Sequence, residues 1–342
     1  MIRTQKNLVK VVNNKIDMKK NIALMAGGNS KEADVSLRSA IQVEENIDKS
    51  LYNVYKIVLK GLDWYYETQE KEYFINKDDF SLTIDNTKII FDGVFIIIHG
   101  TPGENGLLQG YFEMMNIPFA SCSSLVSAIT FDKVVCNAVV RELGVVSVSK
   151  NVSFYKNNQM TVEEIVKKLN FPLFVKPSEG GSSIGMTKVK QKTELEEAIK
   201  TAFDVHDRVI IEEFIKGREL TCGVMQSRGE IIAFPITEII PIKEFFDYEA
   251  KYDGSTSEIT PANVEDKIRI EIQETATKIY QGLNCKGVCR IDFIYNNERD
   301  ELFFLEVNTI PGQSAQSIVP NQVRSMGWST KDLYSRMLEE IL

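Results

Sequence analysis

Short apolar runs that end in glycine-rich turns constrain the fold of this chain more than any other feature. Residues 21–25 form such a run before two glycines, a helix-like stretch begins at Val35, and residues 93–99 form a second run before another glycine-rich turn. Uninterrupted apolar strands that alternate with helices are typical of a parallel sheet covered on both faces. The sequence therefore predicts an N-terminal α/β domain whose ligands lie beyond the carboxyl ends of its strands, where both turns fall.

The rest of the chain continues this alternation. Apolar residues recur every three or four positions over residues 123–143, which predicts one helix that ends at Gly144. Strands at residues 171–176 and 208–215 are expected to flank a loop (177–185) and a helix (193–203). Four further strands are expected at residues 221–225, 231–234, 287–295 and 301–307.

A chain of 342 residues has room for two or three domains. Its 43% hydrophobic and 26% charged residues are ordinary for a globular protein, and we find no repeat or low-complexity linker. We expect divisions near residues 121 and 216. They give a disordered extension (1–17), an N-terminal domain (18–121), a central part (122–216) and a C-terminal part (217–342).

Charge and hydropathy argue against several kinds of partner. The 40 basic and 48 acidic residues give a net charge of −8, which disfavours nucleic acid and anionic membranes. The longest apolar runs, such as residues 94–98, are too short to span a bilayer. Residues 1–17 lack the apolar segment of a secretory signal. We therefore expect a cytoplasmic protein that binds neither nucleic acid nor membrane.

The cysteines show neither a disulfide nor a zinc spacing. Two of them lie four positions apart, but the other three are distant in sequence and the chain has only two histidines. We expect reduced thiols that pack as small hydrophobic side chains. The five are Cys122, Cys136, Cys222, Cys285 and Cys289.

Two strands near the C-terminus carry the strongest signal for chemistry. Side chains alternate along a strand, so Arg290 and Asp292 share one face of the first strand, as Glu306 and Asn308 do on the second. A hairpin that turns at Arg299 sets Asp292 opposite Glu306. Opposed carboxylates destabilise a sheet unless a cation neutralises them, and hard oxygen ligands in this number suit Mg²⁺. The alternative, a solvated salt-bridge face, fits poorly with the apolar residues of the second strand.

A lysine and a glycine-serine loop form a second signal. Lys176 ends an apolar strand, and the loop at 177–185 offers small residues and the hydroxyls of Ser182 and Ser183. Such a loop can surround phosphate oxygens, and an inward-facing lysine is stabilised by an anion. It is not a Walker A loop, because no Gly-Lys-Ser/Thr follows. A plain surface turn is the alternative.

A third signal is the strand edge at residues 211–215, which is followed by Glu219. The backbone and apolar side chains of such an edge can hold a purine, while a carboxylate can bind ribose hydroxyls. Glutamates that merely cover the surface are the alternative.

The order of these parts resembles ATP-grasp enzymes, and residues 18–342 more narrowly resemble D-alanine–D-alanine ligases. The motifs are AGGNSKEADVS (26–36), HGTPGENG (99–106), VKPSEGGSSIG (175–185), DYEAKY (247–252), RID (290–292), EVN (306–308), and PG (311–312) running on to SIVP (317–320). The resemblance implies an N-terminal Rossmann-like parallel-sheet domain followed by an ATP-grasp fold of two subdomains. It also implies ATP-dependent ligation of two D-alanines through an acyl phosphate, with release of ADP and phosphate, for peptidoglycan synthesis.

By position, the resemblance also assigns the nucleotide and metal ligands. Lys133, Lys176 and Lys251 are expected to bind the ATP phosphates. The adenine is expected to bind to Glu212 and to the backbone of Glu213, Phe214 and Ile215, and the ribose to Glu219. Asp292, Glu306 and Asn308 are expected to bind two Mg²⁺ ions, which Mn²⁺ can replace.

The amino-acid substrates receive a second set of residues from the same resemblance. Glu32 takes the ammonium of the first D-alanine, Ser317 and Ile318 hold the second, and His99 lines the site. Arg290 and the Gly312 N–H are expected to stabilise the oxyanion of the reaction. Ser182, Tyr252 and Glu32 are expected to form a hydrogen-bonded latch. Tyr252 is expected to favour D-alanine as acceptor, since the matching position tends to be Phe in relatives that make D-alanyl-D-lactate.

Two departures from the family pattern affect these expectations. Glu179-Gly180 and Ala33-Asp34 stand where many members carry Arg-Glu, which bears on loop closure and on the orientation of Glu32. D-alanyl-D-lactate or D-alanyl-D-serine ligation is the alternative activity. A relative that binds nucleotide without ligation fits less well with the complete Mg²⁺ and oxyanion set. The resemblance further implies a homodimer.

Removal of residues 1–17 should leave stability and catalytic rate unchanged, because this segment has no apolar periodicity and precedes the first strand. Denaturant unfolding of the shortened and full chains would test this. A loss of more than ~1 kcal/mol in the free energy of unfolding, the size of a typical single-residue effect, would show that the segment packs.

Overall fold

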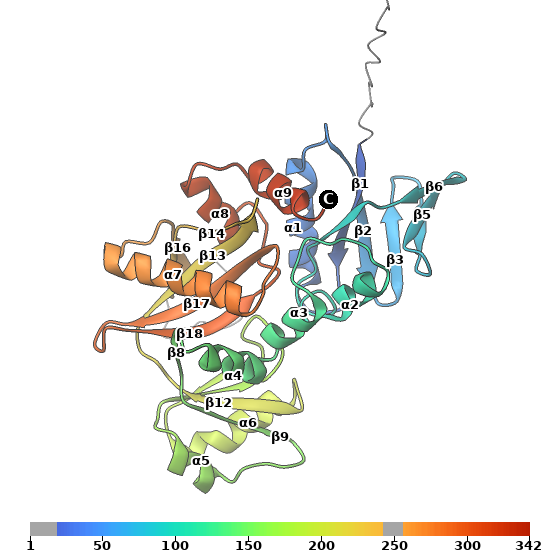
Figure 1. Cartoon of the computed structure of the whole chain (residues 1–342). Coiled ribbons are helices and arrows are strands. Elements are labelled where there is room, and N and C mark those ends of the chain that lie inside the picture. Colours follow the sequence, from blue (N-terminus) through green and yellow to red (C-terminus); the bar gives the residue numbers. More distant parts are fainter. Residues whose placement is uncertain (1–18, 242–255) are drawn as a thin grey trace, which may run out of the picture.

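Three β-sheets, each with helices packed on it, make up the computed structural model, which describes residues 19–241 and 256–342 (Figure 1). Each sheet has its own buried apolar cluster. No helix within these ranges is long and apolar enough to cross a membrane.

The first sheet joins a parallel part to an antiparallel part, in the order β6-β5-β4-β3-β2-β1-β7. β1 (Lys20–Gly27) runs parallel to both of its neighbours, β2 (Tyr52–Lys60) and β7 (Gly93–Ile96). The outer strands are antiparallel: β3 (Asp63–Glu67), β4 (Glu72–Asn76), β5 (Ser81–Ile84) and β6 (Thr87–Ile90). The predicted parallel pairing is thus limited to β2, β1 and β7, because tight hairpins can join only antiparallel strands.

The C-terminus closes the core of the first sheet. α1 (Ala33–Asn46) and α2 (Leu107–Met114) pack on the sheet, as do α8 (Ile318–Ser325) and α9 (Thr330–Glu339) from the far end of the chain. α9 lies beside α1 (Figure 1), and the Tyr334 ring stands edge-on to Phe95, with 5.6 Å between the ring centroids. The two ends of the described chain therefore share one hydrophobic core.

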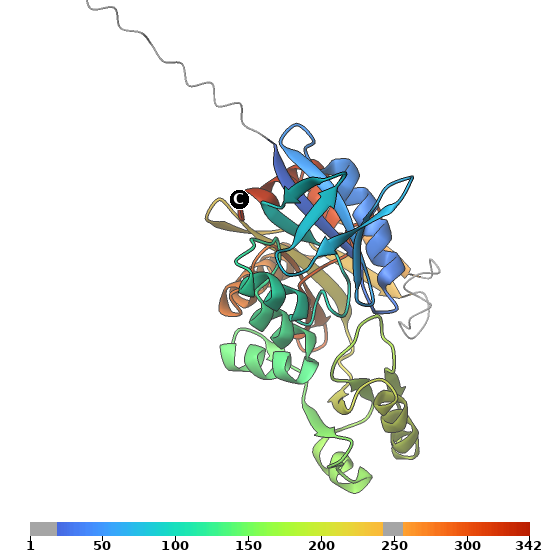
Figure 2. The same cartoon turned by 90° about the vertical axis from the view of Figure 1, so that its right-hand side faces the viewer.

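The second sheet is small, antiparallel and ordered β11-β10-β12-β9. Its strands are β9 (Asn151–Tyr155), β10 (Leu173–Pro177), β11 (Thr187–Val189) and β12 (Arg208–Glu213). α5 (Val162–Lys168) and α6 (Leu195–Phe203) complete its core, and a 3-10 turn, η1 (Lys192–Glu194), precedes α6, so the predicted helix at 193–203 starts slightly later. This part projects from the rest of the molecule in two perpendicular views (Figures 1 and 2).

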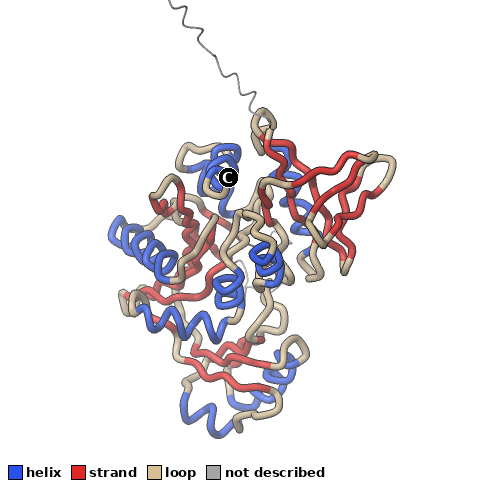
Figure 3. The backbone as a smooth tube through the Cα atoms, turned by 45° about the vertical axis from the view of Figure 1, so that its right-hand side comes forward, coloured by secondary structure: helices blue, strands red, loops and turns tan. Residues whose placement is uncertain are grey.

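The third sheet is ordered β16-β15-β13-β17-β18-β8, with β14 paired to β13. Its strands are β8 (Ser147–Val148), β13 (Arg218–Ser227), β14 (Glu230–Ala233), β15 (Thr237–Pro241), β16 (Thr256–Ile259), β17 (Val288–Asn296) and β18 (Glu301–Asn308). α7 (Asp266–Gly282) contributes a large part of its apolar core. The three sheets surround the middle of the molecule (Figure 3), so loops from all three can reach one place.

The sequence predicts one helix over residues 123–143, and the structure corrects this to two. α3 (Ser124–Phe131) and α4 (Lys133–Leu143) are separated at Asp132, whose ψ of 107° is not helical. Its carboxylate accepts the N–H groups of Val134 at 2.8 Å and Val135 at 3.0 Å, which caps α4. The apolar periodicity runs through the break, which is why the pattern alone does not reveal it.

Asp132 also holds α4 against the second sheet. Its carboxylate accepts the Ser178 hydroxyl at 2.6 Å and lies 3.3 Å from the guanidinium of Arg208. The Lys133 N–H donates to the Ser178 carbonyl at 2.8 Å. The cap therefore fixes the position of Lys133 beside the glycine-serine loop.

Asp132→Ala should lower the free energy of unfolding by about 1–3 kcal/mol, since it removes a helix cap and leaves Arg208 without this carboxylate. Asp132→Asn keeps a capping oxygen and should lose less. Denaturant unfolding measures both changes. Equal stability of the alanine variant and the unaltered protein would show that the cap contributes nothing.

Candidate active site

Two adjoining pockets lie where the three sheets meet. Every predicted site residue that the structure describes lines at least one of them, whereas Lys251 and Tyr252 lie outside the described residues. The first pocket contains Glu32, His99, Arg290, Asn308, Gly312, Ser317 and Ile318. The second contains Lys176, Glu212, Glu213, Phe214 and Ile215. Both are lined by Lys133, Ser182, Glu219, Asp292 and Glu306.

The β17–β18 pair forms the floor between the pockets, with the register that the sequence predicts. Asp292 pairs with Glu306, and Arg290 with Asn308. The Arg290 guanidinium donates to both oxygens of Asp292, at 2.9 Å to Oδ1 and 2.8 Å to Oδ2, and the Asn308 amide donates at 3.0 Å. The buried Thr221 hydroxyl, on the neighbouring strand β13, donates to Asp292 as well. Asp292 is therefore surrounded by donors although it is buried.

Arg290 supplies a fixed positive charge at this floor. Burial alone would lower the pKa of its guanidinium, but the ion pair with Asp292 and the nearby carboxylates of Glu306 and Glu104 raise it above the usual value. A buried carboxylate beside a second carboxylate needs such a partner. Carboxylate and amide oxygens also suit a hard divalent cation, so this donor set fits a Mg²⁺ site.

A hydrogen bond joins the glycine-serine loop to the first sheet. The Ser182 hydroxyl donates to Glu32 Oε1 at 2.5 Å, and Glu32 is the residue that precedes α1. A Cβ at Gly181 would come within 3.0 Å of the same carboxylate, so this approach favours a glycine there. Two members of the expected latch are therefore in contact, and the third, Tyr252, lies outside the described residues.

His99 ties the end of the first sheet to the loop that carries Gly312. Its Nδ1 lies 3.0 Å from the carbonyl oxygen of Ile310, and its Nε2 lies 3.4 Å from the Ser39 hydroxyl. Burial lowers the pKa of His99, which favours the neutral ring. Because a carbonyl can only accept, the proton of that ring belongs on Nδ1, and Nε2 is left as an acceptor.

The sequence alone does not single out Glu104, which the structure brings into the first pocket. Burial, with the nearby Glu32 carboxylate, raises the pKa of Glu104 to about 8, although the Gly100 N–H donates to its Oε2 at 2.7 Å. Glu104 lies within the glycine-rich motif at 99–106. A carboxylate in that turn is the only feature of the motif from which its place in the site could have been predicted. Thr221 also escapes the sequence pattern, because its contact with Asp292 depends on the pairing of β13 with β17.

The second pocket combines cations with an apolar wall. Lys176 forms an ion pair with Glu212, and its Nζ lies 5.4 Å from the ring centroid of Phe174. Phe174 and Glu212 are register partners on β10 and β12, which brings all three side chains to one face. Lys188, which lines the same pocket, has its Nζ 3.7 Å from the ring centroid of Phe214. Such a mixture suits a ligand with a flat apolar ring and anionic groups.

Two further contacts hold residues that line the second pocket. Lys133 Nζ donates to the carbonyl oxygen of Gly180 at 2.6 Å, which holds α4 against the glycine-serine loop. The Glu213 carboxylate accepts the backbone and side-chain N–H groups of Asn170, at 2.8 Å and 2.9 Å. The Glu213 side chain is therefore held by Asn170.

Glu104 should make stability depend on pH. Its pKa rises from the ordinary 4.5 to about 8, so the folded protein keeps a proton that the unfolded chain has released. The resulting stabilisation is present at acid pH and is lost as the pH rises through about 8. Between about pH 6 and pH 8, the free energy of unfolding of the unaltered protein should fall by roughly 2 kcal/mol more than that of Glu104→Gln, which does not titrate.

Denaturant unfolding across this pH range measures the difference. Glu72→Gln, at an exposed position of β4, is the matched control and should follow the unaltered protein. Parallel pH profiles for the unaltered protein and Glu104→Gln would show that the proton is not retained.

Comparisons with known proteins agree with this architecture. The family model "D-ala D-ala ligase N-terminus" matches residues 21–122, and "D-ala D-ala ligase C-terminus" matches residues 143–339. The D-alanine–D-alanine ligase of Bacteroides fragilis is 42% identical over 94% of this chain and 99% of its own length. That of Parabacteroides distasonis is 43% identical over 95% of this chain and 98% of its own length.

Solved structures give the same result for the fold. The VanG D-Ala:D-Ser ligase from Enterococcus faecalis superposes with a TM-score of 0.87 at 35% identity, over 95% of this chain and all (100%) of that one. The D-alanyl-alanine synthetase A from Vibrio cholerae gives 0.85 at 26% identity, over 94% of this chain and 98% of that one. The predicted fold class, an N-terminal α/β part followed by an ATP-grasp fold, is confirmed. The chain therefore belongs to the D-alanine–D-alanine ligase family of enzymes.

Proposed function

We propose that this protein joins two D-alanines to D-alanyl-D-alanine with ATP, and releases ADP and phosphate. The observation that carries the proposal is the shared floor of the two pockets, where Asp292 faces Glu306 beside Arg290. Enzymes of this family depend on ATP and a divalent metal ion and act on small molecules. A nucleotide in the second pocket and an amino acid in the first would meet above this floor.

The second pocket supports the nucleotide roles. Lys133 and Lys176, with Lys251, would hold the phosphates, and Glu212 with the backbone of residues 213–215 would hold the adenine. Glu219 lines both pockets, which suits binding of the ribose between them. Lys176 and Glu212 pair with each other, so a bound nucleotide would exchange this contact for contacts to itself.

Asp292, Glu306 and Asn308 would hold two Mg²⁺ ions, which Mn²⁺ can replace. When bound, these ions neutralise the charge of the transferred phosphoryl group. The carboxylates supply the hard oxygen atoms that such ions need, and the β17–β18 pairing keeps them at a fixed separation.

The first pocket supports the roles in amide formation. Glu32 would bind the ammonium of the first D-alanine and turn its carboxylate toward the phosphates, where it becomes an acyl phosphate. Ser317 and Ile318 would hold the second D-alanine, whose amine attacks the acyl carbon and displaces phosphate. Arg290 and the Gly312 N–H would stabilise the oxyanion of that step, because donors fixed in advance need no reorganisation.

The loop residues would protect the reaction from water. Ser182 already donates to Glu32, and Tyr252 would complete the latch over the acyl phosphate. His99 would position the Gly312 loop through its contact with Ile310. Exclusion of water matters because an acyl phosphate hydrolyses readily in an open site.

We also propose domain divisions near residues 121 and 216, a homodimer, and a place in the bacterial cytoplasm, where the product would enter peptidoglycan synthesis. The support for the first division is the family model that ends at residue 122, and the family resemblance supports the rest.

D-alanine–D-serine ligation is the second candidate, because a solved structure with that activity in its name is similar over nearly the whole chain. The test supplies D-alanine with ATP and an equal concentration of D-serine or D-lactate, and the products are identified by mass spectrometry. D-alanyl-D-alanine as the main product supports the proposal. A predominant mixed product would replace it with the alternative.

Asp292→Asn and Glu306→Gln should each reduce turnover by more than about 1,000-fold, since several kcal/mol of charge stabilisation would be lost. ADP release with D-alanine measures the rate. Glu298→Gln, in the exposed turn of the same hairpin, is the control and should retain the unaltered rate. Near-normal turnover of Asp292→Asn or Glu306→Gln, at ordinary Mg²⁺ levels, would show that these residues do not bind the metal ions.

A further inference from the structure

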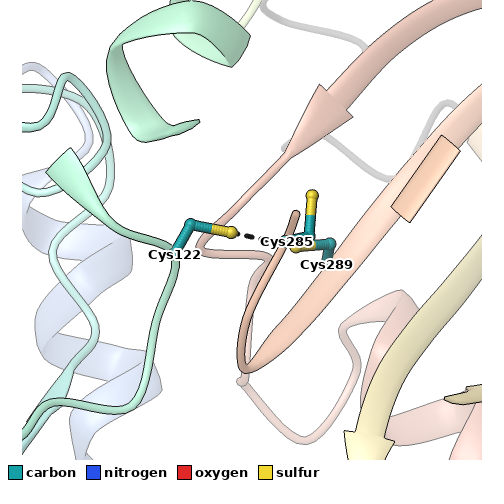
Figure 4. A group of neighbouring side chains, drawn as sticks. All are labelled: Cys122, Cys285 and Cys289. Atoms are coloured by element: carbon teal, nitrogen blue, oxygen red, sulfur yellow. Dashed lines mark hydrogen bonds between the residues drawn. The ribbon is translucent and has the colours of Figure 1, made fainter. Parts of the chain in front are cut away.

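Three of the five cysteines meet in the interior, apart from both pockets. The sulfur atoms of Cys122, Cys285 and Cys289 all lie within 4.8 Å of one another, and 3.5 Å separates those of Cys122 and Cys289 (Figure 4). The three side chains are at most 2% exposed, and none lines either pocket. We call these residues the thiol cluster.

The fold assembles the thiol cluster from two distant segments. Cys122 follows a segment that is hydrogen-bonded to β7 of the first sheet, where the Ala120 N–H donates to Val94 at 2.9 Å. Cys285 and Cys289 flank the turn between α7 and β17. A Cβ at Gly287, whose φ is +63°, would come within 3.1 Å of the Ser121 backbone, so the two segments approach closely.

The expectation for the cysteines does not include this thiol cluster. All five are free and buried, as expected. The spacing argument misses the cluster because Cys122 is 167 positions from Cys289, and only the tertiary fold brings them together.

The surroundings favour a negative charge on one of the three sulfur atoms, that of Cys122. The Lys286 N–H donates to Cys122 Sγ at 3.3 Å. Hydrogen bonds with Cys285 and Cys289, and then this N–H group, hold the pKa of Cys122 well below its usual value. Hydrogen bonds with Cys122, and then burial, raise the pKa values of Cys285 and Cys289 well above the usual value, so a bound ion must displace the protons of these two thiols. The thiolate is the form of cysteine that binds metals.

We propose that Cys122, Cys285 and Cys289 bind one soft, thiophilic metal ion of the class that includes Cu⁺ and Zn²⁺. Thiolate ligands select such ions. Within residues 19–241 and 256–342, no histidine or carboxylate joins the group, which favours three-coordinate Cu⁺ over Zn²⁺, an ion that usually takes four ligands. Three metal–sulfur bonds form as the thiols release their protons to solvent, and no electrons are transferred.

The position of the thiol cluster indicates what the ion would do. It would link the segment after the first sheet to the start of β17, the strand that carries Arg290 and Asp292. Cys289 lies on the opposite face of β17 from these two residues, because side chains alternate along a strand. The ion would therefore stabilise the strand from behind without contacting substrates, and its binding free energy would add to folding stability.

The test uses the full, reduced chain with Cu⁺ or Zn²⁺ alone. Each ion is supplied to the folded protein and during refolding, because the thiols are buried. Metal content, X-ray absorption and thermal unfolding give the stoichiometry, the ligand atoms and the stabilisation. We expect one ion per chain, a shell of three sulfur atoms, and an unfolding midpoint that rises with the concentration of the ion. These readouts do not depend on ligase activity, so the test is separate from the proposed function.

Cys122→Ser, Cys285→Ser and Cys289→Ser should each weaken binding by at least about 100-fold, since a ligand matters at least as much as the groups that orient it. Cys222→Ser is the matched control, because Cys222 is equally buried and lies outside the thiol cluster. It should bind the ion as the unaltered chain does.

Several results would overturn the proposal. They are the absence of a stoichiometric ion under both loading conditions, a shell of oxygen or nitrogen atoms, and equal loss of binding in Cys222→Ser. One equivalent of Zn²⁺ in place of Cu⁺ supports the site and identifies its occupant. The X-ray absorption result on the unaltered chain decides the matter even if a serine variant fails to fold.

Discussion

The pairing of β17 with β18 is the constraint on which the site depends, because it holds Asp292 opposite Glu306. Like charges across two strands oppose pairing unless something neutralises them. The backbone ladder fixes their separation, and Arg290, Asn308 and Thr221 each donate to Asp292. The charge of the site is thus built into the middle of the third sheet, and the loops of the other two sheets need only reach it.

Those loops reach it through contacts between sheets. Ser182 from the second sheet meets Glu32 from the first, and His99 at the end of the first sheet meets Ile310 beyond the third. Lys133, on the helix that follows the capped break, donates to Gly180. Each contact joins segments that are far apart in sequence, so the pockets form only when all three sheets are assembled.

Features that depend on residues close together in the sequence could be predicted, and features that depend on distant residues could not. The pairing of Asp292 with Glu306 could be predicted from the two-residue period of strands and one turn. The shift of register between Asp292 and Phe293, which moves the pairs nearer the turn by one residue, could not. The break at Asp132 could not, since the apolar period continues across it and the contacts that hold it involve Ser178. The antiparallel outer strands, the elevated pKa of Glu104 and the thiol cluster depend on tertiary neighbours, which a pattern within one segment does not contain.

The protonation states of two buried groups set the net charge of the first pocket. The neutral ring of His99 adds no positive charge, and the elevated pKa of Glu104 spares the pocket a further negative charge near neutral pH. Within the described ranges, the other carboxylates that line this pocket still outnumber its two cations, Arg290 and Lys133. An ammonium group or a metal ion would neutralise that negative excess. A charged His99 would reduce the excess, so burial of its ring helps to set which ligands the pocket can accept.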